Sequence, residues 1–341
     1  MSSATYREAG VDLEAGARAV ALMKQAVQAT YGPEVLLGVG AFGGLFDGSA
    51  LKAMDAPVLV ASTDGVGTKT KIATAMGRYD QIGYDIVNHC LNDILVQGAR
   101  PLFFLDYIAA SRLEPEIIAA VVQGCAAACQ AAGCALLGGE TAEMPGVYQP
   151  NEFDLVGTIV GLVDRQRIID GQSIEPGDRI VGLASSGLHT NGYSLARRVF
   201  QDWDLEAVVP ELEQPLGEAL LTPHRAYLAE VEQVWAAGIT IKGMAHITGG
   251  GVIDNLPRIL PRGVAARLHR GSWPGMPIFD LIRRTGQIDN DEMDRVFNLG
   301  LGMLLVVSAD QVEQTLSLIG KGAWAVGKIT SHDGGPFVQI L

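Results

Sequence analysis

The stretch PVLVASTDGVGTKTK, residues 57–71, joins an apolar segment to a polar one. Its Val-rich first half is typical of a buried β-strand. An acidic residue, two glycines and two lysines follow: Asp64, Gly65, Gly67, Lys69 and Lys71. Amides of a glycine loop can face a ligand, lysines bind phosphate oxygens as point charges, and Asp64 suits Mg²⁺, which prefers oxygen ligands. A polar turn with a solvated lysine pair explains the pattern equally well.

Length and charge restrict the classes of protein that this chain can belong to. It has 341 residues, 48% of them apolar and 18% charged, which favours a well-packed protein of two domains. Its formal charge is −13, and it has no long Lys/Arg run. Because nucleic-acid binding normally needs a basic stripe, we expect no nucleic-acid partner. A phosphate-bearing small substrate would need local cations or metal ions.

The termini, the apolar runs and the cysteines indicate the compartment. The sequence shows no signal-peptide pattern and no uninterrupted apolar run of about 18 residues. We therefore expect neither a membrane span nor a membrane partner. The cysteines do not have the spacing of a CxxC metal knuckle. They are Cys90, Cys125, Cys129 and Cys134. We expect buried thiols and a reducing, cytoplasmic location.

Strand patterns alternate with helix patterns along the chain, which predicts an α/β (α+β) fold in two domains. The turn EPGD lies at the expected junction. The predicted parts are an N-terminal extension with a glycine-rich loop, a first domain and a second domain, at residues 1–56, 57–165 and 176–341. Glycines 38, 40 and 43 satisfy G-x-G-x-x-G, but the flanking residues predict neither the strand nor the helix of a dinucleotide site.

The segment of residues 81–97 predicts a helix with one apolar face and one polar face. The apolar stripe is Ile82, Ile86, Cys90 and Ile94. The polar positions are Asp85, His89, Asn92 and Asp93. Either the polar face is solvated, as on any surface helix, or it supplies ligands for a metal and a substrate.

Acidic residues also follow two other predicted strands. GGETAEMPG, residues 138–146, places Glu140 and Glu143 on a predicted loop after a short strand, and Asp106 ends PLFFLD similarly. Ligands of α/β proteins commonly bind beyond strand ends. The alternative is that these carboxylates only make the loops soluble.

Two glycine-rich loops precede predicted helices in the second domain. SSGLHTNGYSLARR, residues 185–198, has Asn191 as a candidate helix cap, and HITGGG covers residues 246–251. Glycine and hydroxyl groups before a helix can accept an anion. His189 and His246 lie in these loops, although a lone histidine is more often a structural hydrogen-bonding group.

The combination of segments resembles a known family. STDGVGTK, NDILVQGARPLFFLDY, GGETAEMPG, SSGLHTNGYSLAR and HITGGG occur in this order. Asp93-x4-Gly98-Ala99-x-Pro101 resembles the D-x4-G-A-x-P element of the ATP-dependent superfamily that includes aminoimidazole ribonucleotide synthetase. EMPGVY, FFLDYIA and YREAGVD point within it to the phosphoribosylformylglycinamidine cyclo-ligase family. The likeness runs from Tyr6 to about Thr330.

The resemblance implies an activity and an assembly. The family closes the imidazole ring of purine biosynthesis with ATP, by phosphorylating the formamide oxygen of formylglycinamidine ribonucleotide before a ring nitrogen displaces phosphate. It implies ATP and Mg²⁺ as cofactors, and a homodimer in which N-terminal sheets pair into a barrel-like interface. The first domain would then bind ATP and dimerise.

The resemblance also implies roles for residues of this chain. Metal-linked carboxylates would be Asp64, Asp93 and Glu140. Nucleotide and phosphate contacts would come from Asp64, Gly65, Gly67, Thr68, Lys69, Lys71, Asn92, Asp93, Gly138, Gly139, Glu140 and Thr141. The phosphoribosyl substrate would contact Ser186, Gly187, His189, Asn191, Gly249, Gly250 and Gly251. Catalytic groups would be Lys69, His189 and His246.

The sequence departs from the family pattern at two places, and two other functions are alternatives to the one that the resemblance implies. GAFGG replaces a GGFGA-like stretch, and FNLGLGM replaces the common FNCGVGM, which argues against an obligatory thiol there. One rival is another enzyme of the superfamily, such as a thiamin-monophosphate kinase, a selenophosphate synthetase or a hydrogenase-maturation protein. The other is a non-catalytic nucleotide-binding regulator.

Overall fold

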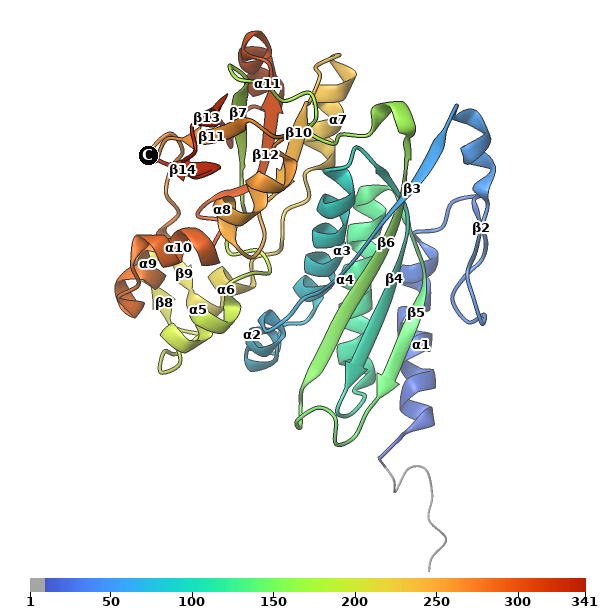
Figure 1. The fold of residues 1–341 in the computed structure, drawn as a ribbon. Coiled ribbons are helices and arrows are strands. Elements are labelled where there is room, and N and C mark those ends of the chain that lie inside the picture. The colour runs from blue at the N-terminus through green and yellow to red at the C-terminus, as the bar shows by residue number, and fades with distance from the viewer. Residues whose placement is uncertain (1–9) are drawn as a thin grey trace, which may run out of the picture. The chain divides into compact units, whose positions relative to one another are not determined.

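Helices and sheets are mixed throughout the chain, as the sequence predicts, and they form two compact units. The computed structural model describes residues 10–341, so part of the YREAGVD segment and of the predicted extension lies outside the described residues. Unit 1 runs to Ile94 and continues over Ala99–Gln166, whereas unit 2 comprises Leu95–Gly98 and Arg167–Leu341 (Figure 1).

Unit 1 is built around a four-stranded sheet with the order β3-β6-β4-β5, in which only the β4–β5 pair is parallel. Its elements are α1 (Leu13–Gln28), β1 (Val35–Leu37), β2 (Leu45–Phe46), η1 (Gly48–Ala53), β3 (Pro57–Gly65), α2 (Lys69–Met76), α3 (Asp80–Leu95), β4 (Arg100–Ala110), α4 (Pro115–Ala132), β5 (Ala135–Glu143), β6 (Phe153–Asp164) and η2 (Arg165–Arg167).

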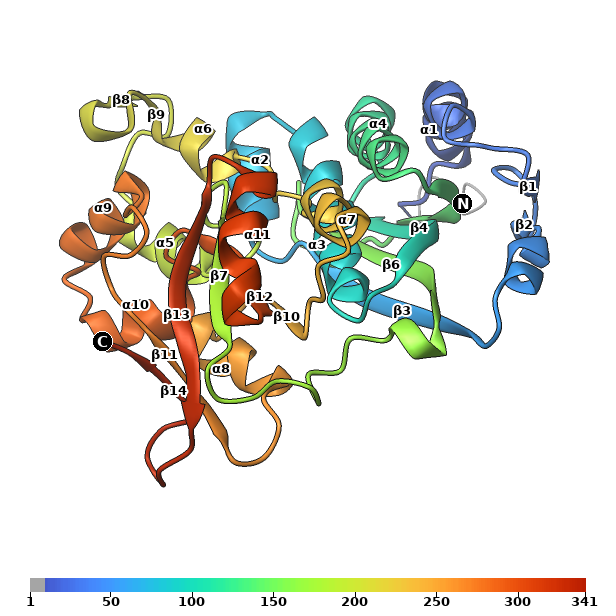
Figure 2. The ribbon, with the colours of Figure 1, turned by 90° about the horizontal axis from the view of Figure 1, so that it is seen from above.

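The helices α1, α3 and α4 all cover the same face of this sheet (Figures 1 and 2). Side chains of β3 alternate accordingly, with Val58, Val60 and Ser62 more buried than Leu59 and its neighbours on the other face. Leu59 is 59% exposed. We call the face that carries Leu59 the open face of unit 1.

Helices α3 and α4 pack closely because each has a glycine at their crossing. A Cβ atom on Gly83 would lie 2.2 Å from the carbonyl oxygen of Val121, and one on Gly124 would lie 2.0 Å from that of Asp80. Helix α4 is long and apolar enough to cross a membrane by length and composition, but half of its residues are buried inside unit 1. It is therefore a core helix of this unit.

Unit 2 contains a six-stranded sheet with the order β10-β12-β7-β13-β11-β14, antiparallel except for the β11–β14 pair. Its elements are β7 (Arg179–Ala184), α5 (Tyr193–Val199), β8 (Val208–Val209), η3 (Pro210–Leu212), β9 (Gln214–Pro215), α6 (Leu216–Leu221), α7 (Leu228–Ala236), β10 (Gly243–His246), α8 (Gly251–Asn255), η4 (Leu256–Ile259), β11 (Val264–Leu268), α9 (Pro277–Gly286), α10 (Asn290–Val296), β12 (Leu301–Val307), η5 (Ala309–Gln311), α11 (Val312–Ile319), β13 (Ala323–Ser331) and β14 (Val338–Ile340).

The unit 2 sheet is buried on both faces. One apolar cluster joins the strands to α8 and η4 through Val252 and Leu256. A second joins them to α7 and α11 through Val231, Val234 and Val312. Strand β12 therefore consists of seven buried residues, which explains its continuous apolar sequence.

Several local predictions were wrong. Lys69 begins helix α2 instead of lying on a flexible loop. Strand β5 continues to Glu143, so Glu140 lies in a strand and not on a loop, and the N-cap of α5 is Gly192 instead of Asn191. The sequence pattern of residues 223–238 predicts one helix, but helix α7 starts only at Leu228, because residues 222–227 have no regular secondary structure. The expectation of buried thiols is confirmed for all four cysteines, which are free and buried.

Candidate active site

The polar side of α3 is not a solvated face, so the first of the two interpretations of its pattern is wrong. Asp85 and Asn92 are fully buried, and His89 is 4% exposed. His89 Nε2 lies 2.9 Å from Asp64 Oδ2 and 3.7 Å from Asp93 Oδ2. Two carboxylates from β3 and α3 thus meet at one imidazole. We call Asp64, His89 and Asp93 the acidic cluster.

Hydrogen bonds from neighbouring groups hold the carboxylates of the acidic cluster. The Ser62 hydroxyl donates to Asp93 Oδ2 at 3.0 Å, and the Gly65 amide donates to Asp64 Oδ1 at 2.6 Å. Burial raises the pKa of Asp64, but the hydrogen bond and charge of His89 outweigh burial, so its pKa is lowered. Burial lowers the pKa of His89, but Asp64 and Asp93 outweigh that effect and raise it.

The acidic cluster has the donor chemistry that a magnesium ion requires. The side chains of Asp64 and Asp93 are 45% and 27% exposed, so both are accessible. Mg²⁺ usually binds through one or two carboxylates, water and substrate phosphates. Gly67 follows Asp64 closely in the chain; it is exposed and has a φ of +70°, with open space where a side chain would be. The residues present therefore fit Mg²⁺ bound together with a phosphate.

The two lysines of the opening stretch have different environments. Lys69 is fully buried, and its Nζ lies 2.8 Å from Asp85 Oδ1, so in this arrangement it does not reach a surface phosphate. Burial lowers the pKa of Lys69, and the charge of Asp85 offsets part of that shift. Lys71 is partly exposed and forms an ion pair with Glu152. The expectation that both lysines lie on an open loop is corrected.

Glu140 does not join the acidic cluster within one chain. Across the sheet, Asp64 of β3 pairs with Gly157 of β6, Gly157 pairs with Asp106 of β4, and Asp106 pairs with Gly139 of β5. These four positions face the helices. Glu140 is the next residue along β5, so its side chain faces the open face. Strands β5 and β3 are also the two edges of the sheet.

A cavity of about 250 Å³ lies beside β5 on its helix-covered face. The residues around it come from α1, the glycine-rich segment, β4, α4 and β5, and include Gly16, Val39, Gly40, Asp106, Gly138, Gly139 and Thr141. A Cβ on Gly139 would lie 2.4 Å from Asp106 Oδ1, which explains the glycine. The four predicted residues Gly138, Gly139, Glu140 and Thr141 thus line a cavity with a buried carboxyl, beside the strand at the opposite edge of the sheet from Asp64.

The buried Asp106 carboxyl makes stability depend on pH. Burial raises its pKa to about 7. Between pH 4 and 7 the folded state keeps a proton that the unfolded state has lost, so stability falls as pH rises, by up to about 1.4 kcal/mol per pH unit. We expect Asp106→Asn to flatten this decline and to raise the free energy of unfolding most at pH 8. Urea unfolding at pH 5, 6.5 and 8 measures the free energy of unfolding, and Asp55→Asn, at an exposed aspartate, is the control. Equal slopes for Asp106→Asn and wild type would refute the assignment.

In unit 2 the two glycine-rich loops come together. A Cβ on Gly249 would lie 3.2 Å from Asn191 Oδ1. Asn255 Nδ2 donates to the carbonyl oxygens of Thr248, Gly249 and Gly251, which fixes the second loop. Gly250 and Gly251 have φ values of +94° and +59°, which favour glycine. Because α5 and α8 have only seven and five residues, loop amides and side chains must supply any anion contacts here.

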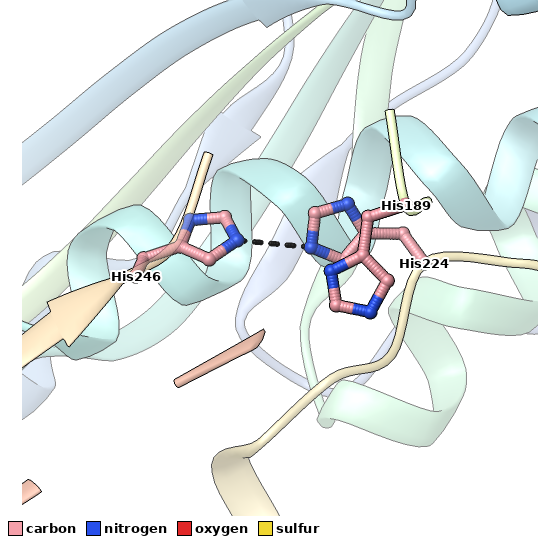
Figure 3. Close-up of side chains that lie close together, drawn as sticks. All are labelled: His189, His224 and His246. Atoms are coloured by element: carbon pink, nitrogen blue, oxygen red, sulfur yellow. Dashed lines mark hydrogen bonds between the residues drawn. The ribbon is translucent and has the colours of Figure 1, made fainter. Parts of the chain in front are cut away.

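His189 and His246 also come together, joined by a histidine that sequence reasoning did not select. His224 Nε2 lies 2.9 Å from His246 Nε2, and the rings of His224 and His189 stack with centroids 4.0 Å apart (Figure 3). Ser186, also predicted to contact substrate, donates its amide to His189 Nε2 at 3.1 Å. No local pattern marks His224, since residues 223–238 read as one helix in the sequence.

Comparison with known families identifies both units. The AIR synthase related protein family matches through its N-terminal domain over residues 47–163 and through its C-terminal domain over residues 175–338. The chain is 53% identical to the phosphoribosylformylglycinamidine cyclo-ligase of Geobacillus kaustophilus (strain HTA426), over 97% of both chains. It is 51% identical to the protein of that name from Syntrophotalea carbinolica (strain DSM 2380 / NBRC 103641 / GraBd1), over 99% of this chain and 98% of the relative.

Solved structures of distant relatives share the fold. A thiamine-monophosphate kinase from Stenotrophomonas maltophilia K279a matches with a TM-score of 0.69 at 20% identity, over 94% of this chain and 95% of that one. The hydrogenase maturation protein HypE in complex with ATP matches with a TM-score of 0.67 at 18% identity, over 95% and 90%. With both domain matches and half of all residues shared over nearly the full length, the chain belongs to the phosphoribosylformylglycinamidine cyclo-ligase family.

Proposed function

We propose that this chain uses ATP to close the imidazole ring of 5-aminoimidazole ribonucleotide in purine biosynthesis. The substrate is formylglycinamidine ribonucleotide, and the other products are ADP and phosphate. The observation that carries this assignment is the 53% identity, over 97% of both chains, to a protein named phosphoribosylformylglycinamidine cyclo-ligase. The acidic cluster supports it, because the formamide oxygen leaves easily only after phosphorylation, a reaction that depends on charge stabilisation.

The acidic cluster is our proposed metal and triphosphate site. Asp64 and Asp93 would hold Mg²⁺, which neutralises charge on the phosphoryl group during transfer. The amides of Gly67 and Thr68 would contact phosphate oxygens, whereas the Gly65 amide already donates to Asp64 Oδ1 and would hold that carboxylate in place. Asn92 is buried on the same helix as Asp93, so it would orient the carboxylates instead of meeting solvent. Lys69 would act through Asp85, and Lys71 would have to leave Glu152 to reach a phosphate.

We further propose a homodimer formed through the open face of unit 1. Leu59 is 59% exposed there, and Glu140 of β5 faces the same side, so a second copy would cover an apolar side chain and bring Glu140 to its interface. Light scattering on the whole protein should give twice the mass of one chain, and Leu59→Glu should shift it towards a monomer. An unchanged dimer in Leu59→Glu would place the interface elsewhere.

The loops of unit 2 are our proposed site for the phosphoribosyl substrate. Ser186, Gly187 and Asn191 would contact it from one loop, and Gly249, Gly250 and Gly251 from the other. The support is their convergence: Gly249 closely approaches Asn191, and the carbonyls of both loops are fixed by asparagine side chains. His189 and His246 border these loops and would move protons during ring closure.

A reaction of ATP with a phosphoribosyl metabolite also supports a cytoplasmic location for this protein.

Turnover of the amidine substrate tests the assignment. Purified protein with ATP, Mg²⁺ and formylglycinamidine ribonucleotide should form 5-aminoimidazole ribonucleotide, followed colorimetrically, with one ADP per product. Thiamin monophosphate replaces the substrate in a parallel reaction, since the kinase shares this fold. Phosphorylation of thiamin monophosphate without ring closure would refute the proposal, and so would ATP binding with neither reaction.

A further inference from the structure

Three buried histidines of unit 2 form one contiguous group (Figure 3). His189 comes from the loop before α5, His224 from the irregular segment before α7, and His246 from the end of β10. Their exposed fractions are 0%, 1% and 6%. One ring nitrogen of each lies within 4.8 Å of the other two. His189 also has a φ of +62°, a left-handed conformation that costs energy for a residue other than glycine.

One hydrogen bond argues against a metal ion as the reason for this group. The backbone amide of Ser186 donates to His189 Nε2 at 3.1 Å. A neutral imidazole has a single acceptor nitrogen, so this bond uses it and places the ring proton on Nδ1. His189 therefore offers no lone pair to a metal, and two histidines would remain. Metal-bound histidines normally donate from their second nitrogen instead.

The contact between His224 and His246 requires a shared proton. Their Nε2 atoms are 2.9 Å apart, so one ring must donate and the other must accept. The other nitrogen of His224, Nδ1, lies 3.3 Å from the Thr190 hydroxyl, which can either donate or accept. His224 can thus exist in either tautomer without losing a hydrogen bond.

The tautomer of His224 decides what His246 can do. If His224 Nε2 accepts, His246 carries its proton on Nε2, and its Nδ1 is a base. If His224 Nε2 donates, the proton of His246 lies on Nδ1, which is then an acid. Stacking of His189 on His224 at 4.0 Å, with the planes 20° apart, holds the His224 ring in the orientation that this contact needs.

We propose that His224 is a positioning residue that sets the tautomer of His246 for ring closure; this inference rests on the proposed function. In that step the amidine nitrogen forms a C–N bond to the activated carbon. The C–O bond to phosphate breaks, and its electron pair leaves with the phosphate. The proton of the attacking nitrogen passes to His246 Nδ1 while His246 Nε2 donates to His224, and His224 can pass charge on towards Thr190.

Two substitutions at His224 separate proton positioning from packing. His224→Phe keeps an aromatic ring for stacking on His189 but removes both nitrogens. His224→Gln places an amide near the position of Nε2 and restores one hydrogen bond to His246. The matched control is His269→Gln, because His269 is exposed and distinct from the group. Melting temperatures of all variants verify that each protein is folded.

We expect His224→Phe to lower kcat roughly 10²-fold, within the range of general acid–base catalysis, and to leave KM for ATP and substrate within about twofold. The pH profile of kcat should lose one limb. His224→Gln should recover about tenfold of the loss, because one hydrogen bond returns without proton transfer, and His269→Gln should match wild type. A folded His224→Phe protein with wild-type kcat and pH profile would overturn the proposal.

Two measurements on the whole protein do not depend on turnover. With ¹⁵N-labelled histidine, NMR should show coupling across the N–H···N bond of His224 and His246, and His224→Phe should lose it. Absence of the coupling in wild type would overturn the tautomer assignment. A transition metal bound to the wild-type protein at one ion per chain, and lost in His224→Phe, would overturn it too. A coupled pair in a protein that does not close the ring would support the tautomer assignment and reject the proposed function.

Discussion

Asp64→Asn lowers turnover by roughly 10²–10³-fold, the usual consequence of removing one charge-stabilising group from a transferring centre. Asparagine keeps the shape and the acceptor oxygen that His89 contacts at 2.9 Å, so the fold is retained. It removes the negative charge with which Asp64 would hold Mg²⁺. The rate of formation of 5-aminoimidazole ribonucleotide, at saturating ATP and varied Mg²⁺, measures the effect.

A second measurement on the same variant reports the geometry directly. The pKa of His89, which burial lowers, is raised mainly by its hydrogen bond to Asp64 and by Asp93. In Asp64→Asn, an NMR titration should show that pKa at a lower value than in wild type. The control is Asp80→Asn, in the exposed first turn of the same helix. Wild-type turnover in Asp64→Asn would remove Asp64 from the mechanism.

Lys69→Met destabilises the protein by about 3–5 kcal/mol, because it leaves the Asp85 carboxylate buried without its partner. Both side chains are fully buried, and Nζ lies 2.8 Å from Oδ1. The double substitution Lys69→Met with Asp85→Asn should recover most of the loss, since no uncompensated charge stays in the interior. Urea unfolding at pH 7 gives the free energies, and a double-mutant cycle isolates the coupling.

The same stretch of sequence supplies the matched control. Lys71 pairs with Glu152, and each side chain is about one third exposed. Lys71→Met should therefore cost less than about 1 kcal/mol. Equal losses for Lys69→Met and Lys71→Met would contradict the buried pair. A large loss of activity in Lys71→Met, with stability retained, would favour Lys71 as the phosphate-binding lysine of the two.

Most elements of unit 1 were predictable because their signals are local. The period of 3.6 in residues 81–97 gave α3, and the apolar run at residues 57–61 gave the start of β3. The same pattern could not say what the polar side of α3 faces. Polar residues opposite an apolar stripe describe a solvated helix equally well, and only the tertiary structure, which places Lys69 of α2 against Asp85, shows that Asp85 and Asn92 are buried.

Glu140 and His224 illustrate two ways in which sequence reasoning about the site falls short. A carboxylate after a strand indicates a ligand position, but register decides the face, and a shift of one residue reverses it. Asp106 and Glu140 therefore lie on opposite sides of the sheet although both follow predicted strands. His224 was assigned to a helix, and nothing within a few residues of it indicates His189 or His246.

The sequence by itself determined the fold class, the family and the segments that carry chemistry, because hydrophobic period, glycine placement and characteristic motifs are local properties of the chain. Only the tertiary structure decided that Asp64, His89 and Asp93 meet, that Lys69 is enclosed with Asp85, and that three buried histidines come together, two of them joined by a hydrogen bond. The physical reason is that burial and contact depend on residues remote in the chain, and these set both pKa values and the partners of each charge.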